Sequence, residues 1–253
     1  MHDSLPLNVL VIEHQKDGGP ALFAERLAAA HAAVTVAGPD AGVDIPDSLE
    51  GFDALVVLGG SSGPTEDDKA PWLPQVRALL EEAVATQTPT LGICLGAQML
   101  ATVQGCTVDR IDAGPEIGLI DLELTEAGAK DPLLGILADA DGKRTAPLRA
   151  VQWHWLEAKQ LPAGSVPLVS SAACQNQAFR VGANAWGVQF HPEAMGQAAR
   201  DWSKDDTDAL AKLGYDANVD LIDPIVGAES ELKNTWSKLF DRWIEIAREA
   251  KNR

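Results

Sequence analysis

The stretch best suited to chemistry is Gly92-Ile93-Cys94-Leu95-Gly96, which places a cysteine between two glycines. An apolar run, 90–93, precedes the cysteine, and small or apolar residues at helical spacing follow it. This pattern predicts a nucleophile elbow, a tight strand-to-helix turn whose glycines remove side-chain clashes. A helix that begins there favours a thiolate and offers its first backbone N–H groups to an oxyanion. A structural cysteine in a glycine-rich turn also fits, so the interpretation depends on the rest of the chain.

A second informative stretch, Gly187–Glu193, ends in His191-Pro192-Glu193. A thiolate nucleophile needs a base that takes a proton and returns it to a leaving nitrogen, and histidine does both near neutral pH. Glu193 would fix the tautomer and orientation of His191, and Pro192 restricts the backbone between them. A surface turn is the alternative for these three residues alone.

The first half of the chain alternates strand-like and helix-like segments. Apolar runs predict strands at 9–12, 33–36, 54–58 and 90–93, and apolar 3/4 spacing predicts helices at 20–30 and 72–86. This rhythm predicts a three-layer α/β/α fold with a flavodoxin-like, mostly parallel central sheet. Ligands bind beyond the carboxyl ends of such strands, so we expect the Gly59–Gly63 loop and Cys94 to face one cleft.

From residue 119 onward, shorter runs predict antiparallel strands added to the same core, at 119–124, 148–153, 166–172 and 179–190. Residues 194–253 are predicted to be helical, with an apolar stripe from Leu232 to Ala247 that packs on its own domain or on a partner. The acidic segment 201–208 is expected to form a solvated loop and helix start. We expect one domain over 1–253, with a catalytic core at about 7–195 and a helical extension at 196–253.

Composition limits the function classes. The 253 residues carry a formal net charge of −17, which disfavours a nucleic-acid surface or adhesion to an anionic membrane. No apolar run approaches a membrane span, no signal peptide is expected, and the three cysteines fit a reducing cytoplasm. A metal site could be assembled from His154, His191, Glu193 and a cysteine, but no ligand spacing resembles a zinc site. We expect no metal and no cofactor.

Together these motifs resemble the class I (triad-type) glutamine amidotransferases. The resemblance rests on four segments: Gly59-Gly60, Gly92–Gln98, Gln177–Gly182 and Gly187–Glu193. It covers about residues 7–195 and is closest to stand-alone members similar to the glutaminase domain of GMP synthetase.

The resemblance implies that a cysteine attacks the side-chain amide of glutamine, that ammonia leaves, and that water hydrolyses the γ-glutamyl thioester to glutamate. By position it makes Cys94 the nucleophile, His191 the general acid/base and Glu193 the orienting residue. It also implies that the oxyanion hole is formed by Gly60 and Leu95, and that Gly59 and Gln98 contact the substrate. Gln175 lies beside a matched motif and is a third candidate for substrate contact.

Two places depart from the family pattern. Ala97 stands where many relatives carry histidine, a position outside the triad. Trp155-Leu156-Glu157 stands where relatives often show His-Gly-Asp, in a loop that borders the glutamine pocket or a partner interface, so substrate preference stays open. We expect His154 to be structural, and Cys106 and Cys174 to be buried or loop thiols.

Other functions stay open. A γ-glutamyl hydrolase or peptidase would use the same triad on a peptide or conjugate. A non-catalytic regulatory module would share the fold, although the intact triad argues against it. A related cysteine-elbow fold of the protease type lacks the His-Pro-Glu terminus.

No G-x-x-x-x-G-K-[ST] signature for ATP is present, so for an amidotransferase we expect a synthetase partner chain to accept the ammonia. A homo-oligomer is also compatible with the sequence.

Overall fold

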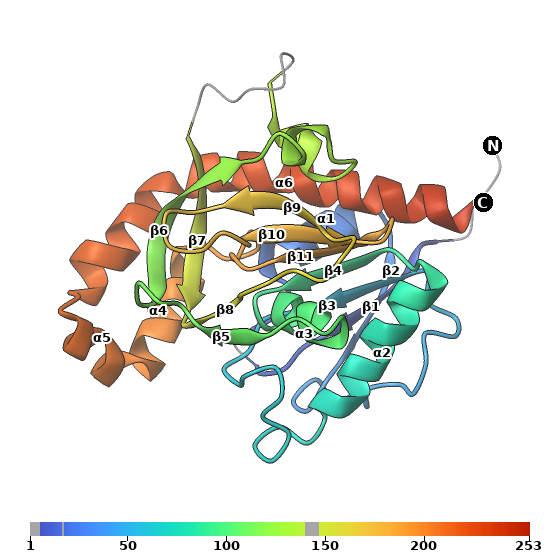
Figure 1. Cartoon of the computed structure of the whole chain (residues 1–253), viewed down its shortest axis with the longest axis horizontal. Helices are drawn as coiled ribbons and strands as arrows, with labels where there is room; N and C mark the ends of the chain where they lie inside the picture. The colour runs from blue at the N-terminus through green and yellow to red at the C-terminus, as the bar shows by residue number, and fades with distance from the viewer. Residues whose placement is uncertain (1–5, 17, 140–146) are drawn as a thin grey trace.

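The chain folds around a nine-stranded sheet, shown in the computed structural model of Figure 1, which describes residues 6–16, 18–139 and 147–253. The strand order is β2-β1-β3-β4-β11-β10-β9-β6-β7. The strands are β1 (Asn8–Ile12), β2 (Ala33–Ala37), β3 (Ala54–Val57), β4 (Thr90–Ile93), β6 (Glu116–Leu124), β7 (Leu148–His154), β9 (Val166–Ser170), β10 (Ala178–Val181) and β11 (Ala185–Val188). Strands β2, β1, β3, β4 and β11 run parallel, and the remaining neighbours pair antiparallel.

Four of the parallel strands, β1, β3, β4 and β11, are buried on both faces, as their continuous apolar runs predict, whereas the edge strand β2 is partly exposed. In β1, Val9 and Val11 join the core on one side of the sheet, whereas Leu10 and Ile12 join the core on the other side. Successive side chains of a strand point to opposite faces, so a four-residue apolar run serves both cores. The predicted α/β architecture is confirmed.

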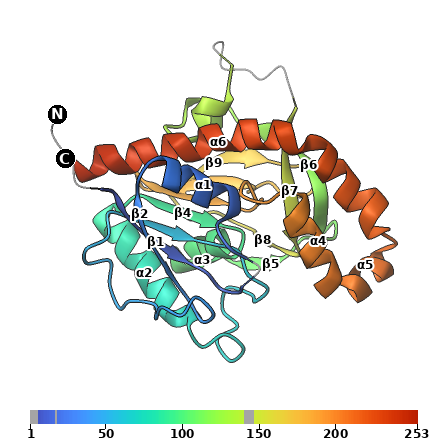
Figure 2. The ribbon, with the colours of Figure 1, turned by 180° about the vertical axis from the view of Figure 1, so that it is seen from behind.

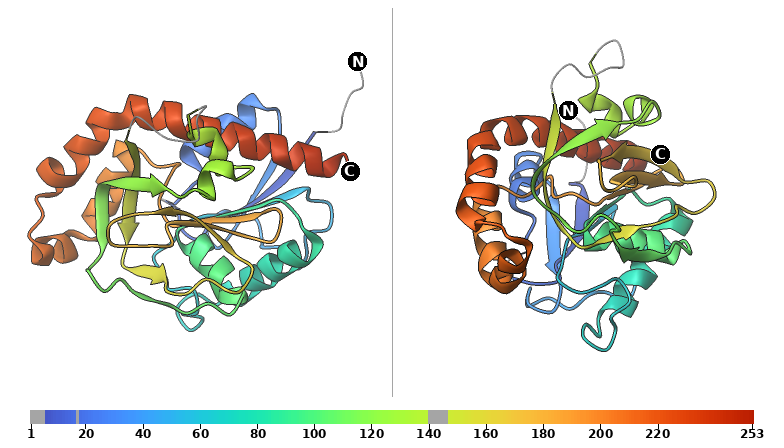
Figure 3. Two further views of the ribbon diagram at one scale, coloured as in Figure 1. Left: turned by 45° about the horizontal axis from the view of Figure 1, so that its top comes forward. Right: turned by 60° about the vertical axis from the view of Figure 1, so that its left-hand side comes forward.

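Helices cover both faces and make three layers (Figure 3). The helices are α1 (Ala21–Ala29), α2 (Leu73–Thr86), α3 (Leu95–Val103), α4 (Gly196–Asp205), α5 (Thr207–Leu213) and α6 (Asp223–Lys251). Helices α1 and α6 lie on the face seen in Figure 2, and α2 and α3 lie on the opposite face. Each helix in the described part of the chain is too short or too polar to span a bilayer.

The apolar stripe of α6 packs on the core of its own chain. Trp236, Phe240 and Trp243 are fully buried, and the ring of Phe240 stacks on that of Phe23 of α1 with centroids 4.3 Å apart. This is the first of the two outcomes that the sequence left open for residues 232–247.

Two sequence expectations need correction, and one small sheet was not expected at all. Strand β11, predicted as part of an antiparallel addition, pairs in parallel with β4. In the acidic segment 201–208, residues 201–205 form the end of α4 instead of a loop, because Ala199 and Ser203 give α4 a buried side, whereas the expected helix start is present as α5, which begins at Thr207. A small second sheet of β5 (Val108–Arg110) and β8 (Leu156–Ala158) was not predicted, since three-residue strands carry too little periodicity to recognise.

Candidate active site

Cys94 lies at the junction of β4 and α3, on the predicted elbow. Its φ of 49° and ψ of −104° lie where residues with side chains rarely occur, so the packing around it must hold the strain. A Cβ on Gly92 would lie 2.6 Å from the carbonyl carbon of Gly96, and a Cβ on Gly96 would lie 2.0 Å from the carbonyl oxygen of Val57. Only glycines therefore permit this turn, which carries the cysteine to the carboxyl edge of the sheet.

His191 reaches the same edge because β11 runs beside β4. Val188 pairs in register with Ile93, and the backbone N–H of Cys94 donates to the carbonyl of Val188 at 2.8 Å. The backbone N–H of His191 donates to the carbonyl of Val151 in β7 at 2.8 Å. Both side chains thus follow the carboxyl ends of adjacent parallel strands, where open α/β sheets bind ligands.

The His191 side chain contacts both Glu193 and Cys94, and all three residues are buried. Its Nδ1–H donates to Oε1 of Glu193 at 2.7 Å, and the ring also hydrogen-bonds with the Cys94 side chain. Burial lowers the pKa of His191, but the negative charges and hydrogen bonds of Glu193 and Cys94 outweigh burial and raise it to about 10. The site therefore favours an imidazolium beside the sulfur, ready to protonate a leaving group.

Gly59 and Gly60 bring the backbone against this pair. A Cβ on Gly59 would lie 2.9 Å from Cε1 of His191, and a Cβ on Gly60 would lie 2.9 Å from Cβ of His14 and from Cδ2 of Leu95. In the described residues, the backbone N–H groups of Gly60 and of Leu95, the first residue of α3, donate no hydrogen bond. Both groups are therefore available to an oxyanion.

These residues open into a cleft of about 850 Å³. Its lining combines the loop 60–66 after β3, Cys94 and Gln98 of the elbow, the segment 153–156 and part of α4 and α5. The segment around Trp155 and Leu156 therefore borders the cleft, which is the first of the two places that the family resemblance offered for this loop.

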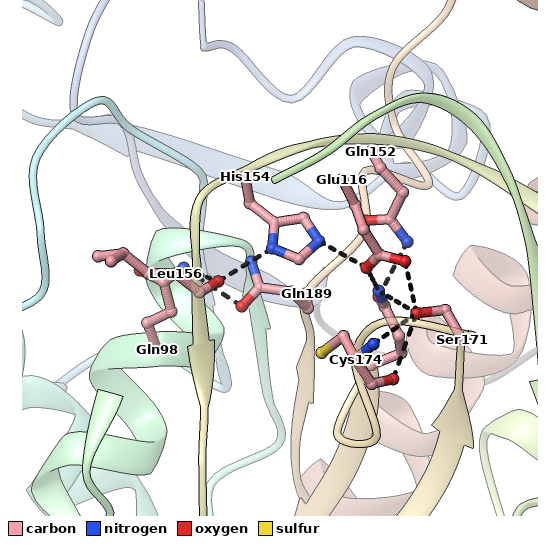
Figure 4. A network of polar contacts seen from close by, with 9 residues as sticks. Gln98, Glu116, Gln152, His154, Leu156, Ser171, Cys174 and Gln189 are labelled. Carbon is pink, nitrogen blue, oxygen red and sulfur yellow. Dashed lines mark hydrogen bonds and ion pairs between the residues drawn. The ribbon is translucent and has the colours of Figure 1, made fainter. Parts of the chain in front are cut away.

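Gln98, on the first turn of α3, lines the cleft and is held by a buried polar network (Figure 4). Its Nε2 donates to the carbonyl of Leu156 at 3.3 Å and to Oε1 of Gln189 at 3.2 Å. Nδ1 of His154 bonds the same Leu156 carbonyl at 2.9 Å, and its Nε2 lies 3.3 Å from Oε2 of Glu116. His154 is thus a buried part of this network, as expected, although it also lines the cleft.

Glu116 forms the deep end of the network. Its carboxylate accepts hydrogen bonds from Oγ of Ser171 at 2.6 Å and from Nε2 of Gln177 at 2.5 Å. Gln177, the first residue of a matched motif, therefore supports the network from behind. Gln175 is exposed and does not line the cleft, so the structure does not bring it to the substrate position expected for it.

The other cysteines lie outside the elbow, as expected. Cys106 and Cys174 are buried and free, and burial raises the pKa of both thiols. A raised thiol pKa keeps the sulfur protonated and poorly nucleophilic. Across the residues that the structure describes, no group of three or more His, Cys, Asp or Glu is arranged to hold a metal ion.

Several cleft residues belong to none of the segments that the sequence marks as functional. Trp202 of α4 lies with its ring 4.7 Å from that of His191, and Nε1 of Trp153 donates to Oδ2 of Asp206 at 2.7 Å. These residues belong to no motif, because the packing of α4 over β7 decides their place. The sequence offers one signal for Trp202, namely its position shortly after the His-Pro-Glu segment.

Comparison with known proteins agrees with this geometry. The family model described as glutamine amidotransferase class-I matches residues 20–205, and the chain therefore belongs to that family. In solved structures, the chain resembles a glutamine amidotransferase from Thermotoga maritima at 28% identity and a TM-score of 0.81, over 96% of this chain and 100% of that one. It resembles one from Methylobacillus flagellatus at 25% identity and a TM-score of 0.82, over 95% of both chains.

Curated relatives are similar over a shorter segment. The chain is 31% identical to the putative glutamine amidotransferase-like protein YfeJ of Salmonella typhimurium, over 60% of this chain and 62% of that protein. It is 26% identical to gamma-glutamyl peptidase 3 of Arabidopsis thaliana, over 58% and 57% of the two chains. It is 36% identical to a glutamine-hydrolyzing GMP synthase subunit of Natronomonas pharaonis, over 42% of this chain and 52% of that protein. The matched segments thus span 52–62% of these relatives' own lengths.

Proposed function

We propose that the chain is a glutaminase-type enzyme that hydrolyses the side-chain amide of glutamine through a γ-glutamyl thioester on Cys94. The observation that carries the proposal is the convergence of an elbow cysteine, a buried His191–Glu193 pair and two unused backbone donors on one cleft. This set supplies a nucleophile, an acid/base and an oxyanion site.

The first step forms the thioester. The Cys94 thiolate attacks the amide carbon, and the backbone N–H groups of Gly60 and Leu95 bind the oxyanion; removing one such donor typically costs about 100–1000-fold in rate. The His191 imidazolium then gives its proton to the leaving nitrogen, the C–N bond breaks and ammonia departs.

The second step reverses the roles. Neutral His191 takes a proton from water, and the resulting hydroxide attacks the thioester carbon. The C–S bond breaks, glutamate leaves, and the thiolate and imidazolium are restored. Glu193 keeps the ring oriented throughout, and Gln98, which is hydrogen-bonded to Leu156 and Gln189, would hold the glutamine side chain.

The ammonia would serve a synthetase partner chain. Relatives named as subunits of GMP synthase support this proposal, because a protein named as one subunit implies a second chain.

The test is product release from glutamine by the purified chain. We expect ammonia and glutamate in equal amounts, and we expect Cys94→Ala to lower turnover at least about a thousandfold. Cys106→Ala is the matched control, since that thiol lies outside the cleft lining. A glutamine-like electrophile should label the natural chain and Cys106→Ala but not Cys94→Ala. Turnover retained in Cys94→Ala contradicts the proposal.

A second candidate is a γ-glutamyl peptidase or hydrolase with the same chemistry. The size of the cleft, about 850 Å³, favours it, because such a volume is typical of sites for ligands much larger than one amino acid. The similarity to a gamma-glutamyl peptidase of Arabidopsis thaliana points the same way. Cleavage of a γ-glutamyl dipeptide in preference to glutamine would support this candidate over the first.

A further inference from the structure

An aromatic surface adjoins the proposed acid/base. The rings of Trp202 and His191 have centroids 4.7 Å apart with planes tilted by 53°, and the ring of Trp153 lies 5.7 Å from that of Trp202. Trp155 lines the same cleft. We call Trp153, Trp155 and Trp202 the tryptophan wall.

The tryptophan wall lies where a leaving group would depart. His191 must come within hydrogen-bond reach of the scissile nitrogen to protonate it. Any substituent on that nitrogen therefore emerges beside the His191 ring, against which Trp202 packs. With glutamine as substrate, the nitrogen carries only hydrogen atoms, and the wall has no part of the leaving group to contact.

Packing of the fold accounts for only part of the wall. Trp153 is buried, and its Nε1 bond to Asp206 ties β7 to the end of α4. Trp155 and Trp202 stay half-buried beside a cleft of about 850 Å³. When a ligand ring covers aromatic surface in a concave site, the burial of apolar area stabilises the complex.

We propose that the tryptophan wall is a subsite for the leaving amine, and that the preferred substrates are γ-glutamyl amides of arylalkyl amines. This inference rests on the proposed thioester chemistry of Cys94 and deepens the hydrolase candidate. The Cys94 sulfur forms a bond to the γ-carbonyl carbon, the C–N bond breaks, and the His191 proton goes to the nitrogen, so that the arylalkyl amine leaves. Water then releases glutamate.

The test compares amides that share a γ-glutamyl group. The probes are γ-glutamyl-benzylamide, γ-glutamyl-methylamide, γ-glutamyl-(4-aminobutyl)amide and glutamine, each followed by glutamate release. We expect kcat/KM for the benzylamide to exceed that for the methylamide and for glutamine by about tenfold or more, since filling an apolar subsite with a ring brings at least that factor.

Variants separate a binding role of Trp202 from a structural one. Trp202→Ala should lower the benzylamide-to-methylamide ratio of kcat/KM to within about twofold of unity, and Trp202→Phe should restore most of it. If Trp202 only supports His191, all amides lose activity together and the ratio stays. Tyr215→Ala is the matched control, because it removes an exposed aromatic ring from the segment after α5, outside the cleft lining. Trp155→Ala serves as a second variant should Trp202→Ala fail to fold.

The outcomes distinguish failure of the arylalkyl subsite from failure of the Cys94 thioester chemistry. Equal rates for all amides, or a preference for glutamine or the aminobutyl amide, overturn the arylalkyl subsite and leave the Cys94 chemistry standing. An unchanged ratio in Trp202→Ala and Trp155→Ala also overturns the subsite. Failure to cleave any of the four amides overturns both.

Discussion

Nδ1 of His191 lies 2.7 Å from Oε1 of Glu193, and both side chains are buried. The other carboxylate oxygen, Oε2, has no hydrogen-bond partner in the part of the chain that the structure describes. The carboxylate of Glu193 therefore interacts chiefly with the imidazole ring of His191. Because water does not screen a buried pair as it screens an exposed one, this contact should control both the orientation and the protonation of His191.

Removing this charge should cost most of the activity. Glu193→Gln keeps the shape and an acceptor oxygen but no longer stabilises an imidazolium. We expect kcat/KM to fall by about a thousandfold or more, with thermal unfolding little changed. Glu25→Gln, an acidic residue outside the main cleft, is the control. Activity within tenfold of the natural chain would show that another group orients the histidine.

The pH profile should report the same contact. The pKa of His191 is raised to about 10, so the ring holds its proton below that pH and loses it above. We therefore expect the alkaline limb of kcat/KM near pH 10, far above the ordinary histidine value of about 6.5. In Glu193→Gln the limb should move toward lower pH, since one raising charge is gone. The measurement is kcat/KM of the natural chain and of Glu193→Gln from pH 6 to 11. The same alkaline limb in both proteins would refute the role of Glu193 in raising the pKa of His191.

Gly59 should tolerate no side chain. A Cβ there would lie 2.9 Å from Cε1 of His191, so Gly59→Ala must displace the ring. We expect a loss of at least about tenfold in kcat/KM, because small misplacements of reacting groups are costly. Gly227→Ala is a sharp control: a Cβ on this exposed α6 glycine meets nothing within 4 Å, and the change should stabilise the helix by up to about 1 kcal/mol. Full activity in Gly59→Ala would contradict the close approach.

The elbow and its strands were predictable because their signals are local. Gly92 and Gly96 mark the turn by spacing alone, and the apolar runs of β1, β3 and β4 show burial on both sheet faces. The meeting of Cys94 with His191 was expected from the acid/base chemistry of histidine and from the family resemblance. Its physical cause is the parallel pairing of β11 with β4, which no short segment reveals.

The rest of the cleft depends on contacts between distant parts of the chain. Glu116 joins the Gln98 network through Gln177 and His154, and Trp202 arrives on a helix that the sequence suggested was partly a loop. Gln175 shows the opposite error, since a position beside a matched motif need not share its cleft. Side-chain placement across such distances follows from tertiary packing, not from spacing.

His14 provides a test that does not depend on catalysis. It is buried beneath Gly60, its Nδ1 accepts a hydrogen bond from Nε1 of Trp72 at 3.1 Å, and its Nε2 has no partner within the described residues. Burial lowers the pKa of His14 to about 4. The unfolded chain, with a histidine pKa of about 6.5, therefore binds more protons between these two values.

The stability of the natural chain should accordingly be complete above pH 6.5 and fall as the pH drops toward 4. His14→Asn keeps an acceptor for Trp72 but cannot be protonated. We expect the loss in free energy of unfolding between pH 7 and pH 5 to be smaller in His14→Asn than in the natural chain by on the order of 1–2 kcal/mol. His31→Asn is the matched control, because His31 is exposed and asparagine tolerates its positive φ of 53°. Urea unfolding at the two pH values measures the difference, and an equal loss in His14→Asn and the natural chain would show that other groups drive the acid sensitivity.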